Sequence, residues 1–261
     1  MIHAAPLRGA AVRGQVSAAE WEARVKLAAA YRLMAHFGIT DLTYNHLSAR
    51  VPDAPDRYLI KGQHQLFEEV TASSLLTYDL RGEKVVDTGD YVSLGGLIIH
   101  GGVMEGRPDL MAVFHTHTPA NMGVSVQKPG LLPLTQHAVR FFNRVGYHDF
   151  TGFEMDLEQR ERLVRALDDK LVLIMRNHGV LVCGRSIPEA FVLHHFFEMA
   201  CRAQVAALSI GGGIDNLVVT PDDVAEFAAQ QLESLGEREE DQHDWPALMR
   251  LAQRLDPTFA D

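Results

Sequence analysis

The sequence predicts an α/β fold, a single domain in which helices cover a mostly antiparallel β-sheet. Segments with helical periodicity alternate with short runs typical of strands, and turn residues join some of these runs as hairpins. The interior has no internal repeat and no segment with linker composition. With 47% hydrophobic and 22% charged residues, the chain has ample material for a buried core.

The first element is a helix that we predict from residue 17 to residue 37. Ser17 and Glu20 have the spacing of a capping box, which satisfies free backbone N–H groups at a helix start, and Gly38 is suited to end the helix. One face of this helix is apolar at helical spacing, through Leu27, Tyr31 and Met34.

Short strands are predicted next, at residues 42–47, 57–60 and 75–78. The turn 79–82 leads into residues 84–86 and predicts a hairpin there.

A short buried helix is predicted between Gly95 and Gly106, followed by an apolar strand at residues 110–114. Pro108 separates the two because proline disfavours helical geometry in the residue before it. We expect further helices at 119–126, 156–167, 186–209 and 220–235, and strands at 171–175 and 180–183.

The chain divides into three parts on this interpretation. Residues 1–16 form a flexible N-terminal arm, residues 17–236 the domain, and residues 237–261 a C-terminal segment whose charged stretch 237–244 is solvated. The first nineteen residues carry arginines but no acidic residue, as transit peptides do, yet they lack a strong amphipathic pattern, which favours the arm.

Charge and cysteine content narrow the function classes. Lys and Arg total 24 against 34 Asp and Glu, a formal net charge of -10, which argues against nucleic acid or an anionic membrane as the main partner. No apolar run approaches the roughly 18 to 20 residues of a membrane helix. The two cysteines, Cys183 and Cys201, give no disulfide framework, so we expect a soluble protein of the reducing cytoplasm.

Three histidines at strand ends predict a metal site. His115 and His117 are two residues apart at the end of the 110–114 strand and therefore share one face of it. His178 follows the apolar strand 171–175. Three neutral imidazoles with one open position are typical of a catalytic metal site. The alternatives are polar residues facing a cleft and, for His178, ordinary turn chemistry.

The chain resembles the class II aldolase/adducin family from about residue 20 to residue 209. The likeness is carried by residues 107–118, 131–134, 176–180, 184–185 and 189–191. It is nearest to the adducin-like branch, through His100 and the tract 147–150.

This resemblance implies a three-layer α/β/α fold with a mostly antiparallel central sheet. It also implies a divalent metal held by His115, His117 and His178, with zinc favoured over manganese, cobalt and iron. A small-molecule substrate and a homotetramer with active sites between subunits complete the expectation.

A metal of this kind polarises a carbonyl or hydroxyl–carbonyl pair, and a separate group must move the proton. Sugar-phosphate aldolases of the family carry an acid four residues before the helix histidine, where this chain has Gly96. His100 is the candidate catalytic residue in its place, with a packed histidine as the alternative. Tyr147 and His137 are weaker candidates.

The two stretches that correspond to substrate-binding segments of the family also depart from its pattern. The family's Gly-Asn-x-Ser turn becomes residues 45–48 without the glycine, and its Ser-Ser-Glu stretch becomes residues 94–96. We therefore expect a smaller or aromatic oxo- or hydroxy-acid rather than a sugar phosphate. The candidate substrate-binding residues are Asn45, His46, Lys61 and His137, and Arg50 is a further cation that could serve a carboxylate. Lys61 and Arg50 are equally suited to be solvated surface charges.

Three functions fit these patterns. The first is a metal-dependent lyase that cleaves or decarboxylates a small hydroxy- or oxo-acid or carbonyl compound, and the second is an Fe(II)-dependent oxygenase on the same scaffold. The third is a non-catalytic, adducin-like assembly or binding protein. Adducin has further segments with a basic tail, so we expect no cytoskeletal binding from a chain that ends in an acidic stretch at Asp261.

Overall fold

A seven-stranded sheet forms the centre of the computed structural model, which describes residues 12–85, 90–153, 155–239 and 244–261. The strand order is β3-β2-β1-β4-β7-β6-β5, and every neighbouring pair is antiparallel except β5 and β6. The predicted mostly antiparallel sheet is confirmed. The strands are β1 (His46–Val51), β2 (Ala54–Ile60), β3 (Leu76–Asp79), β4 (Ala112–Thr116), β5 (Val145–His148), β6 (Val172–Met175) and β7 (Gly179–Gly184).

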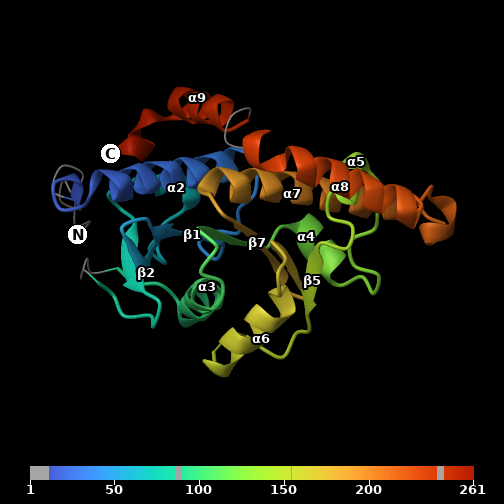
Figure 1. The fold of residues 1–261 in the computed structure, drawn as a ribbon, viewed down its shortest axis with the longest axis horizontal. Helices are drawn as coiled ribbons and strands as arrows, with labels where there is room; N and C mark the ends of the chain where they lie inside the picture. Colours follow the sequence, from blue (N-terminus) through green and yellow to red (C-terminus); the bar gives the residue numbers. More distant parts are fainter. Residues whose placement is uncertain (1–11, 86–89, 154, 240–243) are drawn as a thin grey trace.

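Helices cover both faces of this sheet and make three layers (Figure 1). The long helices α2 and α7 lie on one face with α8 and α9, and α3 and α6 lie on the other. The helices are α2 (Ala18–His36), α3 (Leu94–Gly106), α4 (Pro119–Ser125), α5 (Gln136–Val139), α6 (Glu158–Leu167), α7 (Ile187–Ser209), α8 (Asp222–Glu239) and α9 (Trp245–Leu255), with short 3-10 helices at Phe67–Glu69, Gly213–Asn216 and Pro257–Ala260.

The alternation of β4 explains why both faces are filled. Successive side chains of a strand point to opposite sides, so Phe114 packs in the core beneath α2 while Val113 packs in the core beneath α3 and α6. Each core excludes water from one side of the sheet, which is the main source of stability for such a layered fold. The central strand that carries His115 is therefore buried along its length.

Several predicted elements are confirmed, and others begin or end elsewhere. Ser17 caps α2, because its Oγ accepts from the backbone N–H of Glu20 at 3.0 Å. The strand predicted at 42–47 was placed too early: residues 42–44 form a turn in which Leu42 has a φ of 46°, and β1 starts at His46. Of the predicted hairpin, one bridge between Tyr78 and Lys84 lies within the described residues.

The C-terminal residues belong to the helical layer on α2. Helix α8 continues to Glu239, beyond the predicted end at residue 235. After the gap, Trp245 and Phe259 are buried in the core beneath α2, and Asp256 pairs with Arg32 at 2.8 Å. The predicted arm over residues 1–16 falls mostly outside the described residues. Within the described part of the chain, no helix is long and apolar enough to cross a membrane.

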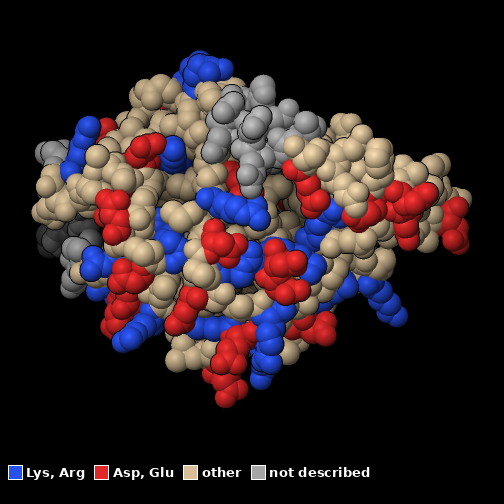
Figure 2. All heavy atoms as spheres, viewed as in Figure 1, with Lys and Arg blue, Asp and Glu red and all other residues tan. Residues whose placement is uncertain are grey.

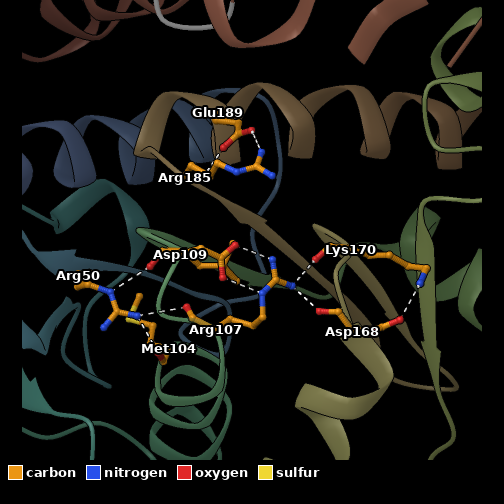
Figure 3. Close-up of polar contacts among 9 residues, drawn as sticks. Arg50, Met104, Arg107, Asp109, Asp168, Lys170, Arg185 and Glu189 are labelled. Carbon is orange, nitrogen blue, oxygen red and sulfur yellow. Dashed lines mark hydrogen bonds and ion pairs between the residues drawn. The ribbon is translucent and has the colours of Figure 1, made fainter. Parts of the chain in front are cut away.

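A polar network secures the start of β4, at the end opposite the histidines (Figure 3). Arg107 pairs with Asp109 through two hydrogen bonds of 2.8 and 2.7 Å and also donates to the carbonyl of Lys170 at 3.0 Å. Arg50 donates to the carbonyls of Leu110 and Met104. These bonds tie α3, β1 and β6 to the entry of β4, so Arg50 is occupied by backbone oxygens rather than by the candidate site.

Over the face in Figure 2, positive and negative side chains are interspersed, with no large area of one sign.

Candidate metal centre

Three histidines meet at the C-terminal end of β4. His115 lies in β4, His117 follows that strand, and His178 lies in the turn between β6 and β7. One ligand nitrogen from each lies within 4.8 Å of the others. The Nε2 atoms of His115 and His117 are 2.8 Å apart, and the His178 ring lies 4.9 Å from the ring centre of His115. The structure thus brings together the three residues that the sequence predicted as metal ligands.

The turn that carries His178 depends on two neighbours. Asn177 has a φ of 58°, a left-handed conformation that asparagine tolerates better than most residues. A Cβ atom on Gly179 would lie 2.5 Å from the carbonyl oxygen of Thr116 and 2.8 Å from the ring of His117. Only glycine permits this close approach, so the Asn-His-Gly sequence places the imidazole against the end of β4.

Hydrogen bonds fix which nitrogen of each β4 histidine faces the centre. The Nδ1 of His115 lies 3.0 Å from the carbonyl oxygen of Val180, and the Nδ1 of His117 lies 3.2 Å from a carboxylate oxygen of Asp41. Both oxygens accept, so both Nδ1 atoms donate and both Nε2 atoms keep their lone pairs. Burial, with the neighbouring imidazoles, lowers the pKa of His115 and keeps it neutral.

This donor set fits a divalent cation. Two nitrogen lone pairs facing each other at 2.8 Å repel unless a positive charge lies between them. Neutral imidazoles are ordinary ligands of Zn²⁺ and of other first-row divalent metals. Asp41 was missed by sequence analysis, because nothing in its local sequence indicates a contact with a residue 76 positions away.

His46 and His100 form a second pair beside this centre. His46 faces His115 across the β1–β4 ladder, with ring centres 5.1 Å apart. Its Nδ1 lies 2.7 Å from the Nε2 of His100, and the other nitrogen of His100 contacts the Oγ of Ser48. His100, the predicted catalytic residue, is fully buried and lies behind His46, and burial lowers its pKa to about 3.

Gly96 lies next to His46 in the first turn of α3. A Cβ atom on Gly96 would be 3.5 Å from the Nε2 of His46 and 2.9 Å from Val92. The imidazole of His46 therefore lies beside Gly96, the position where the resemblance predicts an acid in sugar-phosphate aldolases.

Two further predicted residues reach the same region. Asn45 is fully buried, and its Oδ1 accepts from the backbone N–H of His117 at 2.9 Å, while its Nδ2 has no hydrogen-bond partner among the described residues. Lys61 is 2% exposed, and its Nζ donates to the carbonyl of Thr43 at 2.8 Å. Loss of solvation lowers the pKa of Lys61 to about 8, and its charge helps to lower the pKa of His46.

Two weaker candidates make their contacts elsewhere. His137 lies on α5 and packs on the ring of Phe196 in α7, 5.1 Å away between ring centres. Tyr147 lies beneath the guanidinium of Arg176, and its hydroxyl accepts from the backbone N–H of Leu131 at 3.3 Å.

Exposed apolar side chains flank the centre. The ring of Phe150 lies 6.4 Å from that of His178 and is 45% exposed, and Phe153 follows at 76%. Leu42 and Tyr44, which lie between Asp41 and Asn45 in the sequence, are 72% and 61% exposed, and both of those flanking residues contact His117.

The chain matches the family described as the class II aldolase and adducin N-terminal domain over residues 25–205. It is 40% identical over 250 residues to a putative aldolase class 2 protein of Caulobacter vibrioides, covering 96% of each chain. It is 42% identical over 200 residues to rat alpha-adducin, where the match covers 75% of this chain but 27% of the adducin.

Solved structures give the same grouping. An aldolase II superfamily protein from Pseudomonas syringae superposes with a TM-score of 0.91 at 44% identity, covering 96% of this chain and all of that one. L-fuculose 1-phosphate aldolase from Glaciozyma antarctica superposes with a TM-score of 0.79 at 22% identity, covering 91% of each chain. The predicted class II aldolase-like fold is confirmed.

Proposed function

Because the chain belongs to the class II aldolase and adducin family, we propose that it is a metal-dependent lyase acting on a small hydroxy- or oxo-carbonyl compound. The observation that carries this proposal is the meeting of three imidazoles, two of which hold their Nε2 lone pairs toward each other. A protein that used these residues for packing alone would have no need to direct both lone pairs to one point.

The metal would be held by His115, His117 and His178, and zinc suits three nitrogen donors with an open position, with manganese, cobalt and iron as alternatives. When bound, such an ion supplies Lewis-acid polarisation of a carbonyl or hydroxyl oxygen.

The chain's own residues bind and orient the substrate. The buried Nδ2 of Asn45 donates to a substrate oxygen, because its Oδ1 is held by the backbone of His117 and an unpaired buried donor is costly. Lys61 offers a positive charge to a carboxylate from a buried position. Gly96 supplies no carboxylate, which separates this site from a sugar-phosphate aldolase.

We also propose that the lyase is a cytoplasmic homotetramer with its sites between subunits. The exposed apolar side chains around the centre, including Leu42, Tyr44 and Phe150, support this arrangement because a neighbouring subunit would remove them from water. A non-catalytic, adducin-like binding protein is the second candidate, favoured by the 42% identity to alpha-adducin and by Gly96.

The first test is the metal content of protein purified without added metal. We expect about one equivalent of a divalent metal per chain in the parent, and none in His178→Ala, because two nitrogens hold such an ion far less tightly than three. The matched control is His64→Ala, which changes an exposed histidine outside the three-histidine group.

Parent protein loaded with that metal is then assayed for cleavage or decarboxylation of small hydroxy- and oxo-acids. Absence of a bound metal in the parent would contradict the lyase proposal. A bound metal without turnover of any of these compounds would favour the second candidate.

A further inference from the structure

A groove of about 840 Å³ lies at the ends of β6 and β7 that are opposite to His178. Residues 168–172 line it, and so do Leu193 of α7 and Leu232 of α8. Side chains of the turn 140–144, which precedes β5, complete the lining. Helix α8 is therefore one wall of a groove that lies away from the metal centre.

Helix α8 buries little apolar surface over residues 222–234, where its side chains are described. Ala225 and Ala229 are the only buried residues in that range, and each presents a single methyl group. Val224 and Phe227 are 50% and 61% exposed. Because hydrophobic stabilisation grows with the apolar area removed from water, the packing of these residues holds the helix weakly.

Two contacts outside α8 attach the chain before and after it. The backbone N–H of Thr220 donates to the carbonyl of Pro133 at 3.1 Å, just before the helix begins. Trp245, at the start of α9, is 5% exposed and packs in the core beneath α2. The chain is therefore attached on both sides of α8 independently of the middle of the helix.

Arg144 attaches the middle of α8 through two carboxylates. Its Nε and Nη2 donate to Glu233 at 2.6 and 2.9 Å, and its Nη1 and Nη2 donate to Glu226 at 2.9 Å each. The remaining N–H donates to the carbonyl of Phe142 at 2.6 Å. All five guanidinium donors are used, and four of them bind α8. We call Arg144, Glu226 and Glu233 the arginine clamp.

The arginine clamp is stronger than an ordinary surface ion pair. An isolated exposed pair contributes little to stability, but bidentate arginine–carboxylate pairs that share one guanidinium are the exception. Glu226 and Glu233 are seven residues apart, about two helical turns, so one side chain holds both turns. Hydrogen bonds from Arg144 lower the pKa of Glu226 to about 2 and also lower the pKa of Glu233, so both carboxylates are charged at neutral pH.

Salt can reach the arginine clamp. The side chains of Arg144, Glu226 and Glu233 are 23%, 31% and 58% exposed, and dissolved ions screen charges that contact water. The other charged side chains that line the groove are Arg140, Asp168, Asp169, Lys170, Arg185 and Glu189. They comprise three of each sign and add no net charge there.

We propose that α8 is a salt-dependent cover of this groove, closed by Arg144 and opened locally when the bonds from Arg144 to Glu226 and Glu233 are broken. On opening, the groove becomes accessible while the sheet and the metal centre stay folded. This device does not depend on the proposed lyase activity.

Hydrogen exchange of the full chain tests the cover, with Arg144→Met compared with the parent. Amides of residues 222–239 should exchange about 5- to 30-fold faster in the variant, and those of α7 and β6 should not change. The matched control is Arg162→Met, which removes an exposed Arg–Glu pair of 3.8 Å on α6. Unchanged exchange of α8 would overturn the proposal, and so would equal acceleration of α7 and β6, because the whole domain would then be opening.

Salt gives a test that needs no substitution in the parent. Raising sodium chloride from about 0.05 M to about 1 M shortens the screening length from above 10 Å to about 3 Å. Exchange of α8 should then accelerate in the parent but not in Arg144→Met, which has no clamp to screen. Equal responses of the two proteins would show that Arg144 is not the salt-sensitive contact.

A cysteine in the groove tests whether α8 covers it. Leu193→Cys places a thiol on a groove residue that is 9% exposed, and the native Cys183 and Cys201 are fully buried. Labelling by a maleimide should accelerate about 5- to 30-fold when Arg144→Met is added. If α8 exchanged faster but the thiol were labelled at the same rate, α8 would not be the cover of this groove.

Discussion

The two candidate ligands His115, in β4, and His117, just after it, each have a second ring nitrogen hydrogen-bonded to an oxygen, and these bonds hold the rings in position. His115 uses a backbone carbonyl, which no side-chain substitution removes, while His117 uses the carboxylate of Asp41. A carboxylate partner fixes the tautomer and makes the imidazole a stronger base.

We therefore predict that Asp41→Asn lowers affinity for zinc by about 10- to 100-fold, the usual effect of losing such a partner. The unfolding free energy should change little, because the side chain of Asp41 is 42% exposed. Competition with a chromogenic chelator measures the affinity, and Asp53→Asn in the exposed β1–β2 turn is the control. Equal affinities for the two variants would show that Asp41 does not support the centre.

Lys61 predicts a pH effect whose sign follows from its burial. Loss of solvation lowers its pKa from 10.5 to about 8, so between these values the unfolded chain binds more protons than the folded one. Stability linked to Lys61 therefore rises with pH across this window, and below pH 8 the buried charge opposes folding.

Lys61→Met should accordingly lose this rise, on the order of 2 kcal/mol, when urea unfolding is compared at pH 7.5 and pH 10. Comparison with the parent at both pH values cancels the titration of other groups. A variant with the same pH dependence as the parent would mean that Lys61 keeps its ordinary pKa in the fold.

The sequence could predict the three histidines because each follows an apolar strand, and strand periodicity places His115 and His117 on one face. It could not predict the hydrogen bond between His117 and Asp41 or that between His46 and His100, because both depend on how the folded chain brings distant residues together. Sequence analysis assigned proton transfer to His100 because it lies in an apolar helix. In the structure, His46 contacts both His100 and His115.

At the scale of elements, α7 supports β4 from the side opposite the metal centre. Thr116 and Thr118 alternate with the two histidines and point toward α7, where His194 and Glu198 lie one helical turn apart. The rise over four helical residues, about 6 Å, nearly equals that over two strand residues. The helix and the strand end are therefore joined by two buried side-chain hydrogen bonds, each 2.7 Å long.

Thr118→Val should destabilise the fold by about 2 kcal/mol, because it removes the hydroxyl that donates to the buried carboxylate of Glu198 and that caps α4. Thr118→Ser keeps the hydroxyl and should recover most of this loss. Urea unfolding of the metal-free chains measures both. If the serine variant were as unstable as the valine variant, the methyl group and its packing would be responsible instead.

Elements with strong periodicity were predictable, and short or irregular ones were not. Helix α7 was predicted nearly to its ends because Ser186 and Pro188 mark its start. Strand β5 was missed because it has four residues, one of them a glycine, and it is defined by parallel pairing with β6 rather than by its own pattern. A Cβ on Gly146 would lie 2.2 Å from the carbonyl oxygen of Ala166, so that glycine serves packing against α6.

At the scale of the whole molecule, the metal centre lies at an edge rimmed by apolar side chains. Leu42 and Phe153 are 72% and 76% exposed, which costs free energy in water unless another surface covers them. Sequence analysis did not predict this rim, because these residues lie outside the helices and strands and far apart in the chain. The helical cover of a mostly antiparallel sheet was predictable from the alternation of helices and strands, whereas the three layers were implied by the family resemblance.

The rim predicts that the protein assembles through this edge. Light scattering of the parent should give a mass close to four times the 28.9 kDa chain, and Leu42→Asp with Phe153→Asp should shift the mass toward smaller species because charges are costly in an apolar interface. Val218→Asp, at a 93% exposed position between α7 and α8, is the matched control and should leave the mass unchanged. A parent of single-chain mass would mean that the centre is complete within one subunit. A tetramer that withstands the rim variants but separates on Val218→Asp would place the interface at the α7–α8 connection instead.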